Sequence, residues 1–380
     1  MKRSSSPLLR VLGFGLLAAC GGTSATEGGS EPAGPAGGEA SGVSSETPVT
    51  EPAATTGGTE VHEWALVDVL EGGTTEVGSG PGHPAPGMAV RKPVVYVHLA
   101  DGVDELSFSL DARMTSGSIL EHWPAGALDG AHVRWDVRAR RAHCDTIVPG
   151  ARDARWGTPA DGVTELPDLP SYDAPSAACL TVGDASAGLL FYRGTMGMPS
   201  LPLTVTRGAD MTATVTATGD TSGAPGEVLR VSTALSGPWP LGHVVVSRVA
   251  MPARGETVTL AVGTEAVDVT AEGAHLAEAM LALGLAADEA AAFVHAWSQG
   301  LFGDASAARE ARSARLPAIA PGPPQDSVIY WLSTPAVDAI ATLAIDPPPA
   351  AVRRAFLVRV NLGSVSTASL SGPGPRYATR

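Results

Sequence analysis

Aromatic side chains are scarce in this chain of 380 residues: Phe, Trp and Tyr reach only 5%, and charged residues only 17%. Glycine and proline are abundant instead, with 45 and 31 residues. This balance disfavours long helices and indicates many turns and short strands. Hydrophobic residues, at 44%, exclude a chain that is disordered throughout and are enough for one large domain or two ordinary ones.

Basic residues are also in deficit, because 25 Lys and Arg face 39 Asp and Glu, for a formal net charge of −14. Cleavage before Cys20 would remove three bases and no acid, which leaves 22 bases against 39 acids and a charge of −17. Such a surface repels nucleic acid and anionic lipid headgroups. We therefore expect no nucleic-acid partner.

Long apolar runs are missing near the N-terminus, where the apolar stretch 11–17 is shorter than the ~20 residues of a membrane-spanning helix. The stretch follows the basic residues Lys2, Arg3 and Arg10 and precedes the small residues Ala18 and Ala19. Basic, apolar and small segments in this order are typical of a secretory signal peptide. We expect that peptide to span 1–19.

The sequence Leu17 to Cys20, followed by Gly21, resembles the lipobox read by bacterial lipoprotein processing enzymes. The resemblance implies that the Cys20 thiol is diacylglyceryl-modified and becomes the first residue of the mature protein, anchored in a membrane. Gly21 instead of Asp after the cysteine favours the outer membrane, by analogy with enteric sorting rules. We expect a lipid-anchored protein of the bacterial cell envelope.

Residues 21–60 have low complexity, since 26 of the 40 are Gly, Pro, Ser or Thr and none is Lys or Arg. Such a segment cannot bury a core and is expected to act as a flexible tether. The expected organisation is a signal peptide, an acylated linker, a β-rich domain, a helical hairpin with closing strands, and a loose tail. These parts span 1–19, 20–60, 61–268, 269–362 and 363–380.

Two thiols remain once Cys20 is acylated, and an oxidising compartment favours their pairing. We expect a disulfide between Cys144 and Cys179, which closes a loop of about 35 residues. The alternative is a metal site that combines Cys144 with the neighbouring His143. That alternative lacks the CxxC or HxxxH spacing of common metal sites.

Apolar residues alternate with polar ones between about 61 and 268, as in 105–110, 132–137 and 211–217. A period of two predicts strands, and many short strands predict antiparallel sheets packed as a β-sandwich. Beyond Glu272 the apolar spacing becomes helical, first to Gly284 and then from 289 to 302. A short helix at 335–343 and strands at 327–333 and 356–361 follow. The predicted class is mainly β, or α+β, with a helical hairpin near the C-terminal part.

Several catalytic signatures are missing. His62-Glu63 is followed by Leu66 where a zinc helix of the HExxH type needs histidine. Neither a GxSxG elbow nor a phosphate-binding GxxxxGK[ST] loop occurs. These absences disfavour an enzyme and give no reason to expect a cofactor.

Two similar triads remain, His62-Glu63-Trp64 and Glu121-His122-Trp123, with three further histidines on or near strands: His98, His132 and His143. Two imidazoles and two carboxylates that met at the end of a sandwich would form a metal or acid/base site. The candidate polar site therefore consists of His62, Glu63, Glu121 and His122, with any metal left open. In the competing interpretation both tryptophans are core anchors, and alternation along a strand sends His62 and Glu63 to opposite faces. Arg193 is interpreted as a structural ion-pair residue.

Several short apolar and aromatic motifs recur, in this order, in one family of proteins. They are 62–64, 91–96, 121–124, 191–194, 201–203, 289–302 and 329–332. Through them the chain resembles a family of exported, uncharacterised bacterial proteins, often lipoproteins, that begin with a His-Glu-Trp-Gly-like motif after a linker. Ala65 stands where that family has Gly. The resemblance implies domain boundaries and no chemistry.

Three function classes follow from the sequence. The leading one is a non-catalytic envelope lipoprotein, a binding or scaffold module with an envelope protein or glycan as partner. The second is a metal-dependent or carboxylate hydrolase of envelope polymers, which needs the His and Glu residues in one pocket. The third is a structural subunit of an outer-membrane assembly.

Overall fold

The computed structural model describes residues 58–70, 88–146, 169–196, 200–208, 212–234, 243–302 and 326–362. All of them belong to one compact unit, Pro52–Arg380. The expected signal peptide, Cys20, most of the linker and the tail 363–380 lie outside the described residues. Among the residues that are described, no helix is long and apolar enough to cross a membrane.

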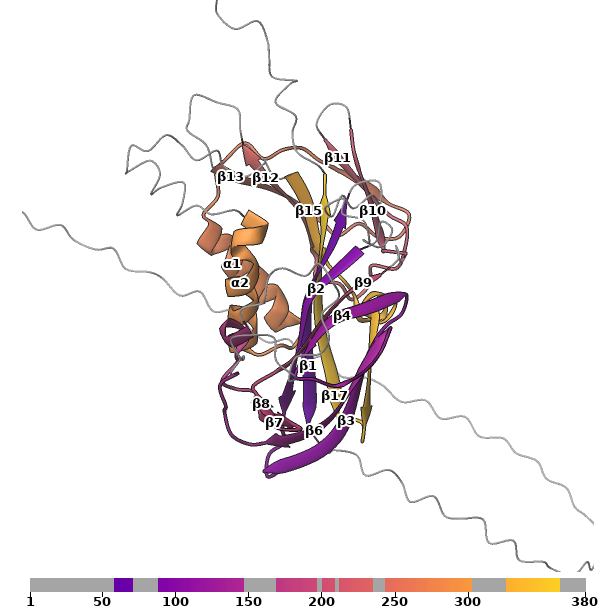
Figure 1. Cartoon of the computed structure of the whole chain (residues 1–380). Coiled ribbons are helices and arrows are strands. Elements are labelled where there is room, and N and C mark those ends of the chain that lie inside the picture. The colour runs from indigo at the N-terminus through magenta and orange to yellow at the C-terminus, as the bar shows by residue number, and fades with distance from the viewer. Residues whose placement is uncertain are drawn as a thin grey trace, which may run out of the picture. The chain divides into compact units, whose positions relative to one another are not determined.

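The largest sheet has eight strands in the order β13-β12-β15-β17-β1-β2-β9-β4 (Figure 1). In chain order they are β1 (Glu60–Leu70), β2 (Met88–His98), β4 (Gly117–Trp123), β9 (Leu190–Met196), β12 (Glu227–Ala234), β13 (His243–Ala250), β15 (Asp326–Trp331) and β17 (Ala351–Asn361). The pairs are antiparallel apart from β1 and β17, which run parallel. The predicted class, mainly β with antiparallel sheets, is therefore confirmed, and the one parallel pair of this sheet is an addition to it.

Two smaller sheets cover one face of this large sheet. One has the order β16-β3-β6-β7-β8, with β5 paired to β6, and the other has the order β10-β11-β14. Their strands are β3 (Glu105–Met114), β5 (Ala127–Asp129), β6 (His132–Arg140), β7 (Cys179–Val182), β8 (Ala185–Ala187), β10 (Leu203–Arg207), β11 (Ala213–Ala217), β14 (Thr257–Leu260) and β16 (Ala341–Asp346). Val133, Trp135 and Val137 of β6 are buried, while the residues between them are exposed. The period of two is thus confirmed.

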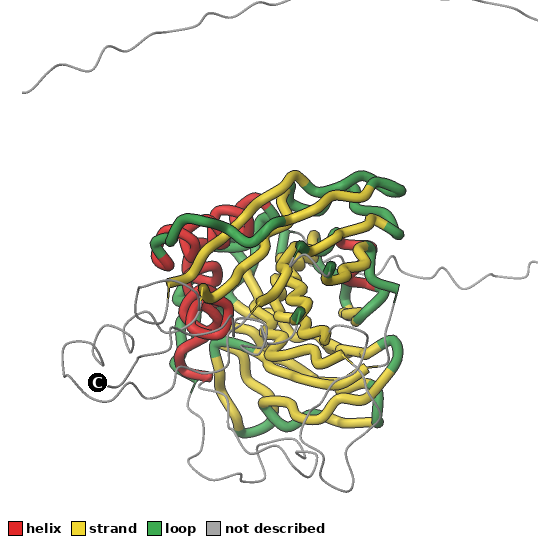
Figure 2. The backbone as a smooth tube through the Cα atoms, turned by 90° about the horizontal axis from the view of Figure 1, so that it is seen from above, coloured by secondary structure: helices red, strands yellow, loops and turns green. Residues whose placement is uncertain are grey.

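Helices cover the other face of the large sheet, as the views along two directions agree (Figures 1 and 2). They are α1 (Val269–Ala282) and α2 (Ala287–Phe302), with the short η2 (Leu169–Tyr172) beside α2. Gly284 follows α1 with φ 90°, a left-handed conformation that ends a helix most easily at glycine. The predicted helical hairpin is confirmed. The helix expected at 335–343 is shorter: α4 (Thr334–Asp338) ends before β16 begins at Ala341.

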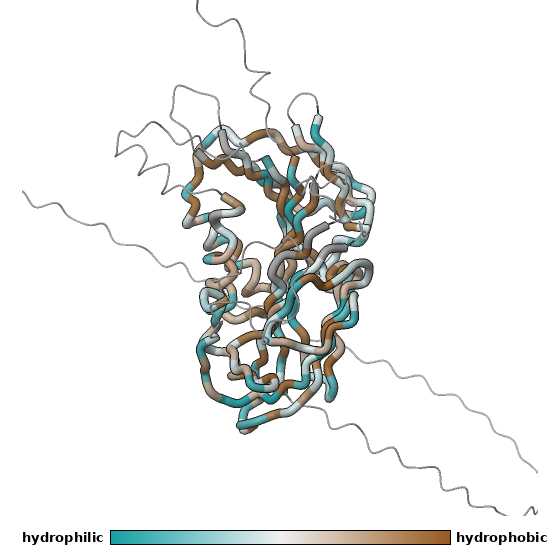
Figure 3. Tube along the Cα trace, viewed as in Figure 1, coloured by the Kyte–Doolittle hydropathy of each residue, from teal (hydrophilic) through white to brown (hydrophobic). Residues whose placement is uncertain are grey.

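Two apolar cores lie on the two faces of the large sheet, and apolar residues recur along the chain there between polar ones (Figure 3). The sheet-side core joins it to the smaller sheets and contains Ala65, Tyr192 and Trp135. The helix-side core joins it to α1 and α2 and contains Trp64 and Phe293. Because β15 and β17 contribute to both cores, the residues beyond 269 share one sheet with the β-rich part that precedes them.

Cys144 and Cys179 lie at disulfide distance. This agrees with the pairing predicted for the two cysteines that remain after Cys20. Their Cα atoms are 5.1 Å apart, and they are separated by 35 positions in the chain. Beside them, the Asp173 carboxylate accepts hydrogen bonds from the Thr146 backbone N–H at 2.8 Å and from the Thr146 hydroxyl at 2.5 Å.

Candidate functional site

The first triad is divided between the two faces of β1. Trp64 belongs to the helix-side core, and Ala65 to the sheet-side core. Because successive side chains of a strand point to opposite faces, His62 shares the helix side with Trp64, and Glu63 faces the smaller sheets. Both residues are buried. His62 and Glu63 therefore act in different surroundings, as the competing interpretation predicted.

Glu63 is part of a buried ion pair with Arg354 of β17. The Arg354 Nε donates to the Glu63 carboxylate at 2.6 Å, and the Tyr192 hydroxyl donates to the other oxygen at 2.6 Å. Arg354 also donates to the carbonyl of Ala341, at the start of β16. Burial and the Glu63 charge raise the pKa of Tyr192 well above its usual range. These contacts tie the large sheet to a smaller one, and Glu63 serves the structure.

The second triad lies on β4, which is separated from β1 by β2 and β9. The Glu121 carboxylate is 2.6 Å from an Arg193 guanidinium nitrogen, so the ion-pair interpretation of Arg193 is confirmed. His122 is buried and stands edge-on to Trp135, with ring centroids 6.0 Å apart. Burial lowers the pKa of His122. The four residues expected to form one polar site therefore do not meet, because the sheet separates them by face and by strand.

His62 instead joins His98 and Glu289, two residues that the sequence did not group with it. The His62 Nδ1 lies 2.9 Å from one Glu289 oxygen, and the His98 Nε2 lies 2.7 Å from the other. The two imidazole rings are 4.3 Å apart between centroids. One donor atom from each residue can be chosen so that all three lie within 4.8 Å of one another. The cluster thus unites the ends of β1 and β2 with the start of α2.

The helix start holds Glu289 in place. Its carboxylate accepts a hydrogen bond of 2.7 Å from the backbone N–H of Ala286. This is a capping contact, in which a side chain of the first turn pairs with a backbone N–H that has no partner within the helix. The preceding Asp288 accepts the backbone N–H and the hydroxyl of Ser176, at 2.7 and 2.8 Å. Acidic residues are favourable at this end of a helix because of its dipole.

The charges in the cluster are strongly coupled. Burial alone would raise the pKa of the Glu289 carboxyl, but the hydrogen bonds from His62 and His98 outweigh it and lower that pKa to about 2. Burial likewise opposes charge on His62, but the contacts with Glu289 and Glu60 raise its pKa. Glu289 is therefore a buried carboxylate at neutral pH. Glu60 stands 3.3 Å from the other nitrogen of His62.

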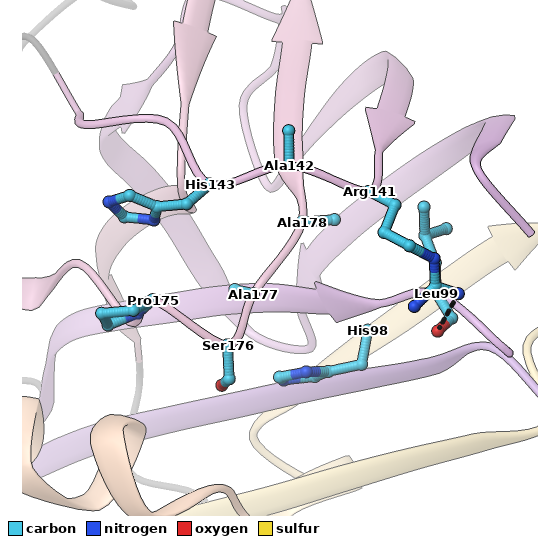
Figure 4. Close-up of a pocket in the computed structure, with 9 residues that line it drawn as sticks. All are labelled: His98, Leu99, Arg141, Ala142, His143, Pro175, Ser176, Ala177 and Ala178. Atoms are coloured by element: carbon cyan, nitrogen blue, oxygen red, sulfur yellow. Dashed lines mark hydrogen bonds between the residues drawn. The ribbon is translucent and has the colours of Figure 1, made fainter.

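A hollow of about 240 Å³ opens beside His98 (Figure 4). It lies between the end of β2, the segment that follows β6 and the segment that precedes β7. Its walls are His98, Leu99, Arg141, Ala142, His143, Pro175, Ser176, Ala177 and Ala178. Arg141 donates to the carbonyls of Leu99 and Val103, which fixes the guanidinium at the wall. His98 belongs to both the cluster and the wall of the hollow. Ser176, also in the wall, is hydrogen-bonded to Asp288, the residue before Glu289.

No family model matches the chain, and no curated protein matches it. Among solved structures it is similar to the Mu homology domain of Fcho1 from Danio rerio with a bound Eps15 peptide, at 9% identity. The match covers 80% of this chain and 96% of that chain, with a TM-score of 0.29. A TM-score of this size does not establish a common fold, so nothing is carried over from that domain. The resemblance to exported lipoproteins remains a prediction.

Proposed function

We propose that this chain is a lipid-anchored envelope protein that acts as a binding module, with the hollow beside His98 as its ligand site. Export and anchoring are supported by the basic and apolar start of the chain and by the lipobox-like ending at Cys20. The disulfide distance between Cys144 and Cys179 agrees with an oxidising compartment. The low-complexity segment 21–60 gives the module a tether.

The residues that line the hollow indicate which class of ligand it binds. Three of its nine described lining residues, His98, Arg141 and His143, carry or can accept positive charge, and none of the nine is Asp or Glu. The acids nearest this wall pair with its basic side chains from outside the lining: Glu289 with His98 at 2.7 Å, Asp104 with Arg141 at 3.9 Å and Asp145 with His143 at 3.2 Å. The lining itself therefore contributes only basic and neutral groups. Such a site attracts an anionic group, a carboxylate or phosphate, which envelope polymers and their fragments supply.

Calorimetric titration of the full chain with inorganic phosphate and with citrate tests this function. Binding should weaken at high salt, because the attraction is electrostatic. His143→Ala removes an imidazole from the wall and should weaken binding, whereas His132→Ala removes one from the outer face of β6 and should leave it unchanged. The proposal fails if neither anion binds, or if the two variants behave alike.

A hydrolase of envelope polymers is the second candidate function. Its support is a buried carboxylate, Glu289, beside the imidazoles of His62 and His98, of which His98 lines the hollow. These groups are suited to acid and base catalysis. The test is the rate of hydrolysis of 4-nitrophenyl acetate and 4-nitrophenyl phosphate. Turnover that is lost in Glu289→Gln and retained in His132→Ala would favour the hydrolase over the binding module.

A further inference from the structure

The cluster beneath the hollow has a donor set that suits a metal ion. His62, His98 and Glu289 offer two imidazole nitrogens and a carboxylate, the ligand types of many zinc sites. They come from three elements and are positions 62, 98 and 289 of the chain, so only the folded chain brings them together. We propose that these three residues bind one zinc(II) ion.

The distances fit this assignment. Ligand atoms around a tetrahedral zinc ion lie roughly 3.3 Å from one another, given bonds of about 2.0–2.1 Å. The nitrogen-to-oxygen distances from the two histidines to Glu289 are 2.9 and 2.7 Å. These two distances run to different Glu289 oxygens, and one donor atom from each residue lies within 4.8 Å of the other two, so side-chain adjustment of about an ångström or less brings the three donors to the spacing of a zinc site. The proposed site adjoins the hollow, because His98 forms part of its wall.

A carboxylate also stands behind one of the proposed ligands. His62 faces Glu289 with Nδ1, and its Nε2 lies 3.3 Å from a Glu60 oxygen. Arg353 holds that same oxygen from the other side, at 3.4 Å. A carboxylate that accepts the second N–H of a metal-bound histidine fixes its tautomer and orientation. A structural ion pair between His62 and Glu289 does not require Glu60, whereas a metal site commonly has such a partner.

Charge balance supports the same assignment. The carboxylate of Glu289 is buried beside the two imidazoles, so a divalent cation there would face its negative charge, while Arg353 offsets the charge of nearby Glu60. The bound ion would also make the floor of the hollow more cationic, in keeping with an anionic ligand there. The metal site does not depend on the proposed function, because it is inferred from the contacts among His62, His98, Glu289 and Glu60.

Cobalt(II), which shows visible absorption in zinc sites, provides the test. The full chain, solubilised in detergent and freed of metal with EDTA, should bind one Co²⁺ that zinc displaces. His98→Gln and Glu289→Gln should each weaken binding by at least ~10–100-fold, and Glu60→Gln by about 10-fold. His132→Gln is the matched control, because His132 lies 3.0 Å from Asp111 and 3.3 Å from Asp129 in an accessible position.

The outcomes separate the two proposals. His98 lies at the rim, with 20% of its side chain exposed, so His98→Gln should keep the fold, which near-ultraviolet circular dichroism verifies. The metal site is overturned if the unmodified chain binds no Co²⁺, or if folded His98→Gln binds it as well as His132→Gln does. If Co²⁺ binding depends on His98 but phosphate and citrate bind neither with nor without metal, the anion function fails and the metal site stands.

Discussion

His62 and His98 belong to neighbouring strands, and their rings lie 4.3 Å apart over the same carboxylate, that of Glu289. The antiparallel register of β1 and β2 pairs His62 with Tyr96 and His98 with Glu60, which places both histidines on one face at the strand ends. The start of α2 then supplies Glu289 from above that face. One polar cluster thus forms at the junction of the sheet, the helix and the hollow.

Membrane anchoring through Cys20 can be tested by cell fractionation. Cys20→Ser should leave the protein in the soluble periplasmic fraction or as an uncleaved precursor, because the acyl acceptor is lost. The double variant Cys144→Ser/Cys179→Ser removes the other two cysteines and should remain with the membranes. If Cys20→Ser fractionates and migrates like the unmodified chain, the lipoprotein assignment is wrong.

The pairing of Cys144 with Cys179 should stabilise the fold by about 3–4 kcal/mol, because the cross-link limits a loop of about 35 residues in the unfolded chain. Urea unfolding of the double variant Cys144→Ser/Cys179→Ser measures the loss. Mass spectrometry of unreduced peptides checks the bond itself. Free thiols that react with an alkylating agent at both positions in native protein would contradict the pairing.

The contact between Glu63 and Arg354 should be among the most sensitive in the structure. Glu63→Gln leaves the buried Arg354 charge without its main partner and should lower the free energy of unfolding by about 3–5 kcal/mol. Glu105→Gln breaks the exposed pair with Arg138 and should have no measurable effect. Equal effects of the two variants in chemical denaturation would show that Glu63 is not the structural tie described above.

Burial of His122 predicts a pH dependence of stability. Its pKa is lowered in the folded state, so the unfolded chain binds a proton there first as the pH falls below about 6.5. The His122 contribution to the free energy of unfolding should therefore decrease between pH 7.5 and 5.5, whereas His62, whose pKa is raised, contributes in the opposite direction. The difference in slope between the unmodified chain and His122→Phe isolates the His122 contribution. His143→Ala controls for the loss of one accessible histidine. A slope that is identical in His122→Phe and in the unmodified chain would contradict this role.

Local patterns predicted much of the fold. The alternation around Trp135 and the helical spacing that ends at Gly284 each depend on near neighbours, and both are confirmed. The parallel pairing of β1 with β17 was not predicted, because it joins residues almost 300 positions apart and leaves no local mark. For the same reason the sequence did not predict that strands from both halves of the chain form one large sheet.

The candidate site was predicted only in part. His62 and His98 were both singled out as polar residues on or near strands, but Glu289 is 227 and 191 positions from them and resembles any acidic residue in a first helical turn. His62 and His122 were expected to meet at the end of a sandwich, yet they are buried on strands that β2 and β9 separate. The prediction placed sequence neighbours such as His62 and Glu63 in one site, which was wrong because successive side chains of a strand point to opposite faces.

Anomalous scattering at the zinc edge tests the central claim most directly, namely that His62, His98 and Glu289 form one ligand site beside the hollow. Crystals of the chain grown with one equivalent of zinc should show a single strong peak about 2.0–2.2 Å from the His62 Nδ1, the His98 Nε2 and a Glu289 oxygen. A peak at His132 or elsewhere on the surface, with none between these three residues, would contradict the account.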